Sequence, residues 1–173
     1  MKKALLLSGG FDSAAVFHLL IEAGELFDVF FVDYNQSYKS KEQEKAKKLC
    51  NMYEDINFTT IAIPGWDDMP GRNFHFINQI QIRGYKEVYL GTRWVLPLFD
   101  SWGDANWVTL KLYGQLLKIK IKLPIVGWTK RKCFKFLSSR NDTDFYNCYK
   151  NNTNWVDCDC SNCKERKRLK NFI

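Results

Sequence analysis

Residues 8–13 read Ser8-Gly9-Gly10-Phe11-Asp12-Ser13 and directly follow the apolar run Ala4-Leu5-Leu6-Leu7. Two adjacent glycines let a backbone approach an anion closely, and the serine hydroxyls can donate hydrogen bonds to it. The amides that open the next helix point to the same place with the positive end of the helix dipole. The stretch therefore predicts a strand, a phosphate-binding loop without the lysine of a Walker motif, and a helix. An ordinary turn with Asp12 as N-cap is the alternative, although it does not account for the whole string.

The composition is that of one globular domain. The chain has 173 residues, of which 46% are hydrophobic, enough to bury a single full core. No run approaches the roughly 20 apolar residues of a membrane span. Met1-Lys2-Lys3 leads directly into the first apolar run, without a signal-peptide pattern. We therefore expect a cytoplasmic protein with no membrane partner.

The formal net charge of +7 raises the question of a nucleic-acid partner. The basic residues concentrate in Lys39–Lys48, Lys111–Lys132 and Lys164–Lys170, without the aromatic interleaving that is typical of a base-stacking surface. The sequence therefore favours solvated helices and a phosphate ligand over direct nucleic-acid binding, which stays open as the alternative.

Apolar runs of strand length alternate with segments of helical period, which is typical of a parallel sheet covered on both faces. The expected strands are Lys3–Leu7, Asp28–Val32, Phe58–Ile63, Glu87–Leu90 and Ile119–Leu123, and the expected helices are Asp12–Ala23, Ser40–Tyr53, Asn73–Arg83, Asn106–Leu117 and Thr129–Leu137. Right-handed crossovers then give a Rossmann-like α/β fold, a doubly wound five-stranded sheet whose ligand lies beyond the carboxyl ends of its strands. One domain over residues 1–173 is expected, with the nucleotide-binding core in 1–138 and a metal-stapled tail in 139–173.

Two further loops carry residues suited to a nucleotide or to its reaction partner. Tyr34 and Gln36 follow the second expected strand, where a ring and an amide can hold adenine or ribose, although a polar loop before a solvated helix explains them as well. Arg72 and Asn73 follow a Pro-Gly turn at a helix start, a position suited to a phosphate or a carboxylate, with a plain surface turn as the alternative. His75, between two phenylalanines, is expected to be a packed side chain rather than a base.

Two later segments add charged groups. Residues 98–104 set Asp100, Asp104 and two aromatic rings around a turn, which can stack a planar heterocycle, accept its hydrogen bonds, or help to hold Mg²⁺. An N-cap at Asp104 with buried rings is the alternative. Lys130 opens another helix and can neutralise a phosphate, although a solvated lysine in a basic run is also consistent with the pattern.

The cysteines predict a metal site in the tail. Four of the six are Cys148, Cys158, Cys160 and Cys163. Four thiolates at short spacing make a closed tetrahedral site, which is typical of structural Zn²⁺, with an iron–sulfur cluster as the alternative. Cys50 and Cys133 fall in expected helices and are predicted to be buried, reduced thiols.

Taken together and in this order, these segments resemble the 7-cyano-7-deazaguanine synthase (QueC) family of PP-loop ATP pyrophosphatases, from Lys3 to about Phe172. The resemblance implies an enzyme that adenylates 7-carboxy-7-deazaguanine with ATP, captures it with ammonia as an amide, and activates the amide again to leave the nitrile. It implies catalytic roles for Asp12, Arg72 and Lys130, and substrate contacts from Arg72, Asn73, Asp100 and Asp104. It assigns ATP to the first two loops, through Leu7, Ser8, Gly9, Gly10, Phe11, Asp12, Ser13, Ala14, Ala15, Tyr34 and Gln36.

The chain also departs from the family pattern. The segment between Ile63 and Pro70 is short, Ser37-Tyr38 stands where Arg-His is usual, and the last cysteines read Cys-x-Cys-x-x-Cys instead of Cys-x-x-Cys-x-x-Cys. These departures leave open another PP-loop ligase, a QueC-like enzyme that transfers a deazapurine, or a nucleotide-binding module without catalysis. Family members are often dimers, and a compact Lys- and Asn-rich chain suits a phage. A homodimer, in a bacterium or a phage-infected host cell, is therefore an expectation that rests on resemblance and composition alone.

Overall fold

The computed structural model describes residues 1–67, 69–93, 106–142, 158–160, 163–164 and 167–168. Strands and helices alternate along this part of the chain, as the apolar pattern predicts. In chain order they are β1 (Lys3–Leu6), α1 (Phe11–Glu22), β2 (Asp28–Asp33), α2 (Lys39–Cys50), β3 (Phe58–Ala62), α3 (Arg72–Gln81), β4 (Glu87–Tyr89), α4 (Trp107–Leu117), β5 (Lys120–Lys122) and α5 (Lys130–Ser138).

The strands form one parallel sheet in the order β3-β2-β1-β4-β5. The chain builds outward from β1 through β2 to β3, and then crosses back to place β4 on the other side of β1. The register sets Ala4 opposite Asp28 of β2 and Val88 of β4. The reversal of strand order beside β1 opens a crevice at the carboxyl ends of the strands, where ligands of such sheets bind.

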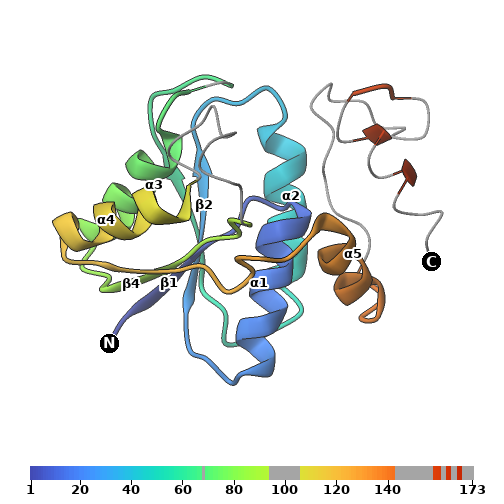
Figure 1. The fold of residues 1–173 in the computed structure, drawn as a ribbon, viewed down its shortest axis with the longest axis horizontal. Coiled ribbons are helices and arrows are strands. Elements are labelled where there is room, and N and C mark those ends of the chain that lie inside the picture. The colour runs from blue at the N-terminus through green and yellow to red at the C-terminus, as the bar shows by residue number, and fades with distance from the viewer. Residues whose placement is uncertain (68, 94–105, 143–157, 161–162, 165–166, 169–173) are drawn as a thin grey trace.

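The helices cover both faces of this sheet, with α1, α2 and α5 on one side and α3 and α4 on the other (Figure 1). Successive side chains of a strand point to opposite faces. Leu5 and Leu7 therefore pack in the core beneath α1, α2 and α5, whereas Ala4 and Leu6 pack in the core beneath α3 and α4. The prediction of a doubly wound, five-stranded α/β sheet is confirmed.

Local capping sets where the helices begin. The Asn106 side chain accepts a hydrogen bond from the Val108 backbone at 2.8 Å and caps α4, and Thr129 caps α5 in the same way. The N-cap of α1 is Gly10, which has no side chain, so the alternative that Asp12 is the N-cap is wrong. The predicted bounds differ most at the end of α2, expected at Tyr53 and found at Cys50.

The side chain of His75 is exposed, and the prediction that it is packed is wrong. Helix α3 turns Ile77 and Ile80 into the core, and a residue between two partly buried phenylalanines faces outward because each helical step rotates the side chain. His18 is buried, and its Nε2 lies 2.6 Å from a carboxylate oxygen of Asp142.

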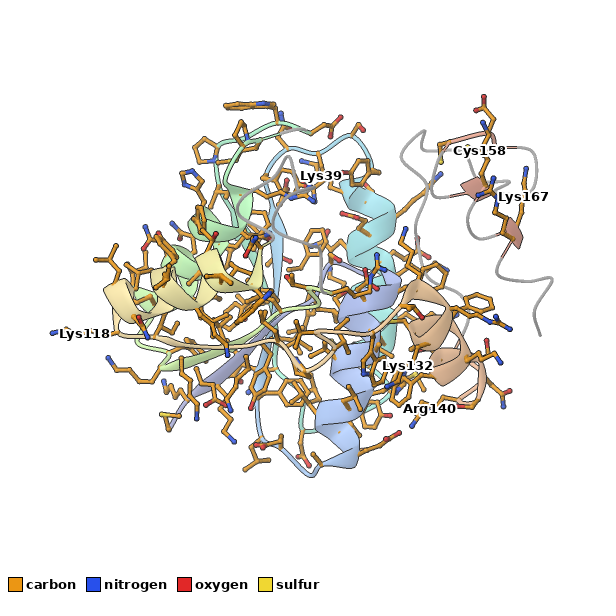
Figure 2. The ribbon with its side chains drawn as sticks, viewed as in Figure 1. Lys39, Lys118, Lys132, Arg140, Cys158 and Lys167 are labelled. Atoms are coloured by element: carbon orange, nitrogen blue, oxygen red, sulfur yellow. The ribbon has the colours of Figure 1, made fainter. Side chains whose placement is uncertain are left out.

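Two cations pack on aromatic rings in and around helix α5. The Nζ atom of Lys132 lies 4.3 Å from the centre of the Trp128 ring, and the guanidinium of Arg140 lies 3.5 Å from that of Phe136. Figure 2 shows Lys132 on this helix and Arg140 just beyond its end. Because these cations cover the rings, the stripe stabilises the helix rather than offering bare stacking faces. Direct nucleic-acid binding remains untested, and its absence stays a prediction.

Within residues 139–173 the structure describes 139–142 and short pieces around Cys158, Cys160 and Cys163. Figure 2 shows Cys158 and Lys167 on the side of the molecule away from Lys118. The division into a core and a tail therefore stays a prediction. Among the helices that the structure describes, none combines the length and hydrophobicity needed to cross a membrane.

Candidate functional site

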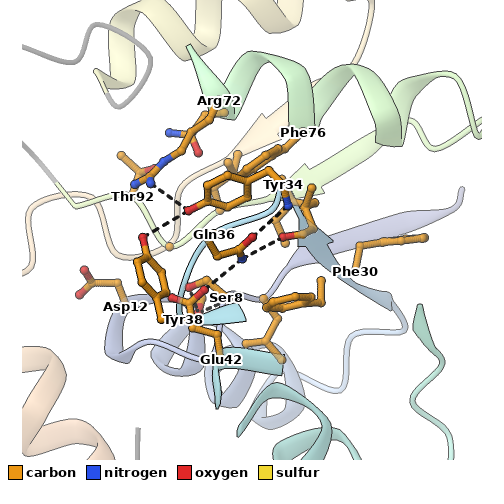
Figure 3. Close-up of a pocket in the computed structure, with 18 of the residues that line it drawn as sticks. Ser8, Asp12, Phe30, Tyr34, Gln36, Tyr38, Glu42, Arg72, Phe76 and Thr92 are labelled. Carbon is orange, nitrogen blue, oxygen red and sulfur yellow. Dashed lines mark hydrogen bonds between the residues drawn. The ribbon is translucent and has the colours of Figure 1, made fainter. Parts of the chain in front are cut away.

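A cavity of about 370 Å³ lies beyond the carboxyl ends of β1, β2 and β4. Figure 3 shows it surrounded by side chains from the first loop, the loop between β2 and α2, helix α3 and the segment after β4. The cavity thus lies where the strand order reverses, as the sheet topology predicts.

The first loop forms one end of the cavity, and its backbone is fixed by close contacts. Gly9 has a φ of +75°, and a Cβ atom at this position would lie 2.4 Å from the carbonyl oxygen of Glu42. The hydroxyl oxygens of Ser8 and Ser13 lie 3.1 Å apart, and Ser13 Oγ donates to the Gly10 carbonyl at 3.1 Å. No side chain among the described residues caps α1, and the positive end of its dipole points toward these hydroxyls, which favours an anion there.

Asp12 lies in the first turn of α1 and faces an arginine from the segment after β4. Arg93 Nε is 2.9 Å from Asp12 Oδ1, and both residues line the cavity. Behind this ion pair, burial and the neighbouring Asp12 carboxylate raise the pKa of Cys133 to about 12. Burial likewise raises the pKa of Cys50 to about 12, so the prediction of two buried cysteines in helices is confirmed.

A chain of hydrogen bonds crosses the opposite wall. Arg72 Nη1 donates to Tyr34 Oη at 3.2 Å, and the Tyr34 and Tyr38 hydroxyls lie 3.5 Å apart. The Tyr34 ring packs on Phe76 with ring centres 5.4 Å apart. Burial raises the pKa of both tyrosines, so they stay neutral. Two neutral rings and a cation suit a flat polar heterocycle that carries a carboxylate.

The buried side chain of Gln36 holds the loop between β2 and α2 in place. Its side-chain oxygen accepts from the Tyr34 backbone at 2.9 Å, and its Nε2 donates to the Val32 carbonyl and to Glu42 Oε2, each at 3.3 Å. Burial raises the pKa of Glu42 from 4.5 to about 8, although Gln36 and Arg72 oppose the shift. Glu42 is therefore largely protonated at neutral pH and able to donate a hydrogen bond.

The cavity brings together many of the residues that the sequence assigned to ATP and substrate. Those that line it are Leu7, Ser8, Asp12, Ser13, Tyr34, Gln36, Arg72 and Asn73. Gly9 and Gly10 belong to the loop itself. The side chains of Phe11, Ala14 and Ala15 are packed in the core, so only their backbone atoms can face a ligand.

Other assigned residues lie elsewhere. Lys130 begins α5 and is not among the described residues that line the cavity. Asp100, Asp104 and Cys148 lie outside the described residues. Sequence reasoning missed Gly91, Thr92 and Arg93, which line the cavity directly after β4. Their place after a strand beside β1 was the available signal, because every strand end at the reversal point borders the crevice.

The cysteine cluster packs against the cavity wall. The sulfurs of Cys158, Cys160 and Cys163 all lie within 4.8 Å of one another, and all three residues are buried. Tyr38 completes the same small hydrophobic cluster. Three converging thiols fit a tetrahedral thiolate site for Zn²⁺, for which Cys148 is the predicted fourth ligand. Bound metal would supply structural cross-linking there rather than chemistry.

Comparison with known proteins supports these features. The family model described as "Queuosine biosynthesis protein QueC" matches residues 2–87. The 7-cyano-7-deazaguanine synthase of Methanococcus aeolicus is 24% identical over 97% of this chain and 94% of its own, and 7-cyano-7-deazaguanine synthase 1 of Sulfurisphaera tokodaii is 26% identical over 96% and 91%. The tRNA(Ile)-lysidine synthase of Wolinella succinogenes is 42% identical over 59 residues, which are 34% of this chain and 18% of that protein.

One solved structure shares the fold. It is described as a predicted subunit of tRNA methyltransferase from Methanocaldococcus jannaschii, and it matches with a TM-score of 0.54 and 14% identity over 80% of this chain and 75% of that one. At this low sequence identity, the match shows a shared fold and says nothing about the reaction.

Proposed function

We propose that this chain, whose residues 2–87 match the QueC family model and which is similar to two 7-cyano-7-deazaguanine synthases, is an ATP-dependent 7-cyano-7-deazaguanine synthase. One observation carries the proposal: the Ser8–Ser13 loop and Arg72 line the same cavity at the carboxyl end of the sheet. A phosphate-binding loop and a cation able to hold a carboxylate are the two elements that adenylation of an acid requires. The relatives with this name align over nearly the whole chain, which favours the same substrate.

The proposed reaction uses ATP twice. A carboxylate oxygen of 7-carboxy-7-deazaguanine attacks the α-phosphorus and releases pyrophosphate. Ammonia then displaces AMP from the acyl carbon and leaves the amide. The amide oxygen attacks the α-phosphorus of a second ATP and releases a second pyrophosphate, and loss of AMP with two protons from nitrogen leaves the nitrile. Adenylation makes oxygen a good leaving group in both halves, and no covalent protein nucleophile is needed.

The residues of the cavity divide this work. Ser8, Ser13 and the first amides of α1 would hold the phosphates, and Arg72 would orient the carboxylate and stabilise charge that develops on it. The rings of Tyr34 and Phe76 would hold the flat ring system of the deazapurine. Lys130, Asn73, Asp100 and Asp104 keep the roles that the resemblance gives them as predictions.

The described cavity does not by itself make a Mg²⁺ site. Its carboxylates are Asp12, which pairs with Arg93, and Glu42, whose pKa is raised to about 8. Hard cations prefer ionised oxygens, and neither group is free to supply one at neutral pH.

A second candidate is another PP-loop ligase, including one that acts on tRNA or transfers a deazapurine. Two observations support this second candidate. The chain has a local identity of 42% to tRNA(Ile)-lysidine synthase, and Ser37-Tyr38 departs from the Arg-His pair that is usual in the QueC family. A nucleotide-binding module without catalysis is the remaining possibility.

The test is to incubate the purified protein with magnesium ATP, ammonium and 7-carboxy-7-deazaguanine and to follow the products by mass spectrometry. AMP, pyrophosphate and the nitrile are expected, with two ATP consumed per nitrile. Omission of the deazapurine is the control. Bound ATP without turnover would favour the module, and turnover only with another acceptor would favour the second ligase.

A further inference from the structure

The segment Gly91–Arg93 lies directly against the phosphate loop. A Cβ atom on Gly91 would be 2.5 Å from the backbone nitrogen of Ser13 and 2.7 Å from the carbonyl carbon of Asp12. Only a glycine permits this approach, because any larger residue would push β4 away from the first turn of α1. The chain therefore brings the two residues after Gly91 to the anion-binding end of the cavity.

Arg93 is held there by charge rather than by a well-formed hydrogen bond. Its Nε is 2.9 Å from Asp12 Oδ1, yet among the described residues neither atom has an aligned hydrogen-bond partner, although both atoms are buried. The two side chains keep 25% and 30% of their surface exposed. Since both residues line the cavity, this exposed part is available to a ligand. Two buried polar atoms without aligned partners indicate a pair that can rearrange when an anion arrives.

The charge of the cavity depends on Arg93. The charged residues in its described lining are Arg72, Arg93, Asp12 and Glu42. The pKa of Glu42 is about 8, so near neutral pH two positive charges face one negative charge and leave one positive charge. Without Arg93 the described lining would be neutral, and a bound polyphosphate would lose the cation that lies beside Asp12 of the loop.

Resting on the proposed function, we infer that Arg93 is a phosphate-binding residue that contacts the ATP phosphates at the Ser8–Ser13 loop, and that Asp12 is the residue that positions it. A guanidinium offers several donors in a fixed plane and binds phosphate oxygens bidentately. The Asp12 carboxylate holds that guanidinium at this end of the cavity by charge.

The test is isothermal titration calorimetry with ATP and with inorganic pyrophosphate, without added divalent cation. Replacing Arg93 by glutamine is expected to weaken binding of both by roughly 10- to 100-fold, since a charge-assisted contact is lost. Arg93→Lys keeps a cation beside Asp12 but not the bidentate donors, so it should recover part of the affinity. Arg83→Gln is the matched control, since Arg83 is exposed at the end of α3 and bonds to Gln79.

The outcomes separate this inference from the proposed function. If wild-type protein binds ATP and Arg93→Gln binds it equally well, the inference fails and the proposed function stands. If Arg93→Lys is as weak as Arg93→Gln while both melt like wild type, the side chain has no role as a cation and the inference also fails. Wild-type protein that binds neither ATP nor pyrophosphate overturns both.

Discussion

The cavity and the cysteine cluster meet at Tyr38, yet they are held together differently. The walls of the cavity are the ends of strands and helices that fill two hydrophobic cores, and its first loop is locked by the contact of Gly9 with Glu42. The cluster, among the described residues, contains three cysteines and Tyr38. So little apolar surface does not offset the entropy of ordering a segment. The cavity is thus formed by the fold itself, whereas we expect the cluster to depend on a metal ion.

This difference predicts that the two regions can be damaged separately. A change in the cavity should remove chemistry and leave stability, and a change in the cluster should remove metal and stability. Among the described residues, only Tyr38 touches both regions, since it lines the cavity and packs on the cysteines.

The largest effect is expected for Asp12→Ala. The change leaves Arg93 unoriented at the phosphates, and turnover should fall on the order of 1000-fold. The free energy of unfolding should change by about 1 kcal/mol or less, because the ion pair is partly exposed. Nitrile formation and thermal melting measure the two quantities. Asp55→Ala, at an exposed position, is the control, and normal turnover in Asp12→Ala would remove the loop from the active site.

Cys160→Ser should have the opposite effect to Asp12→Ala and lower metal content and stability. Loss of one thiolate from the cluster should lower the zinc-to-protein ratio and cost on the order of 3 kcal/mol of stability, because the energy of a structural metal is folding energy. Metal analysis and thermal melting report the change. Cys50→Ser offers a matched control, as it buries a hydroxyl in the core and should lower stability without touching zinc. An unchanged metal ratio in Cys160→Ser would contradict a cysteine metal site.

Gly9→Ala disrupts the close contact between the first loop and the Glu42 carbonyl. Alanine must adopt a φ of +75° and push its Cβ against the Glu42 carbonyl, so the variant should lose roughly 2 to 3 kcal/mol and bind ATP poorly. Gly24→Ala separates strain from collision, because Gly24 also has a positive φ, of +63°, but nothing lies within 4 Å of its added Cβ. It should lose only about 1 kcal/mol and keep ATP affinity. Equal losses in the two variants would show that the contact with Glu42 is unimportant.

Much of the cavity could be predicted because its signals are local. Strand, glycine pair and helix start lie within a few residues of one another, and strand order places their loop at the crevice. Arg93 could not be predicted, because its partner Asp12 is distant in sequence and only the pairing of β1 with β4 brings them together. The contact of Tyr38 with the cysteines could not be predicted either, because it also joins residues that are distant in sequence. His75 shows the opposite error, since apolar neighbours in sequence do not share a helix face.

Glu42 makes the stability of the cavity wall depend on pH. Its pKa is raised in the fold from 4.5 to about 8, so the folded state holds a proton that the unfolded state has already released. Stability from this group is therefore complete below about pH 4.5 and is lost as pH rises to about 8, with a slope of up to about 1.4 kcal/mol per pH unit.

Glu42→Gln should flatten that slope and stabilise the protein at pH 8. Denaturant unfolding across the range gives the slope for each variant. Glu44→Gln, exposed on the same helix, should retain the slope of the wild type. A slope that survives in Glu42→Gln would mean that Glu42 is ionised in the folded protein.

The smallest effect is expected at Tyr38, where the two regions meet. Tyr38→Phe keeps the ring against the cysteines and removes the hydroxyl that lies 3.5 Å from Tyr34 Oη. Zinc content should stay unchanged, whereas affinity for the deazapurine should fall by roughly 0.5 to 1.5 kcal/mol, the usual value of one hydrogen bond, because Tyr34 and through it Arg72 lose a support. Tyr38→Ala removes the ring as well, so it should lower both zinc content and affinity. If Tyr38→Phe alone released zinc, the hydroxyl rather than the ring would join the two regions, and the cluster would depend on the cavity.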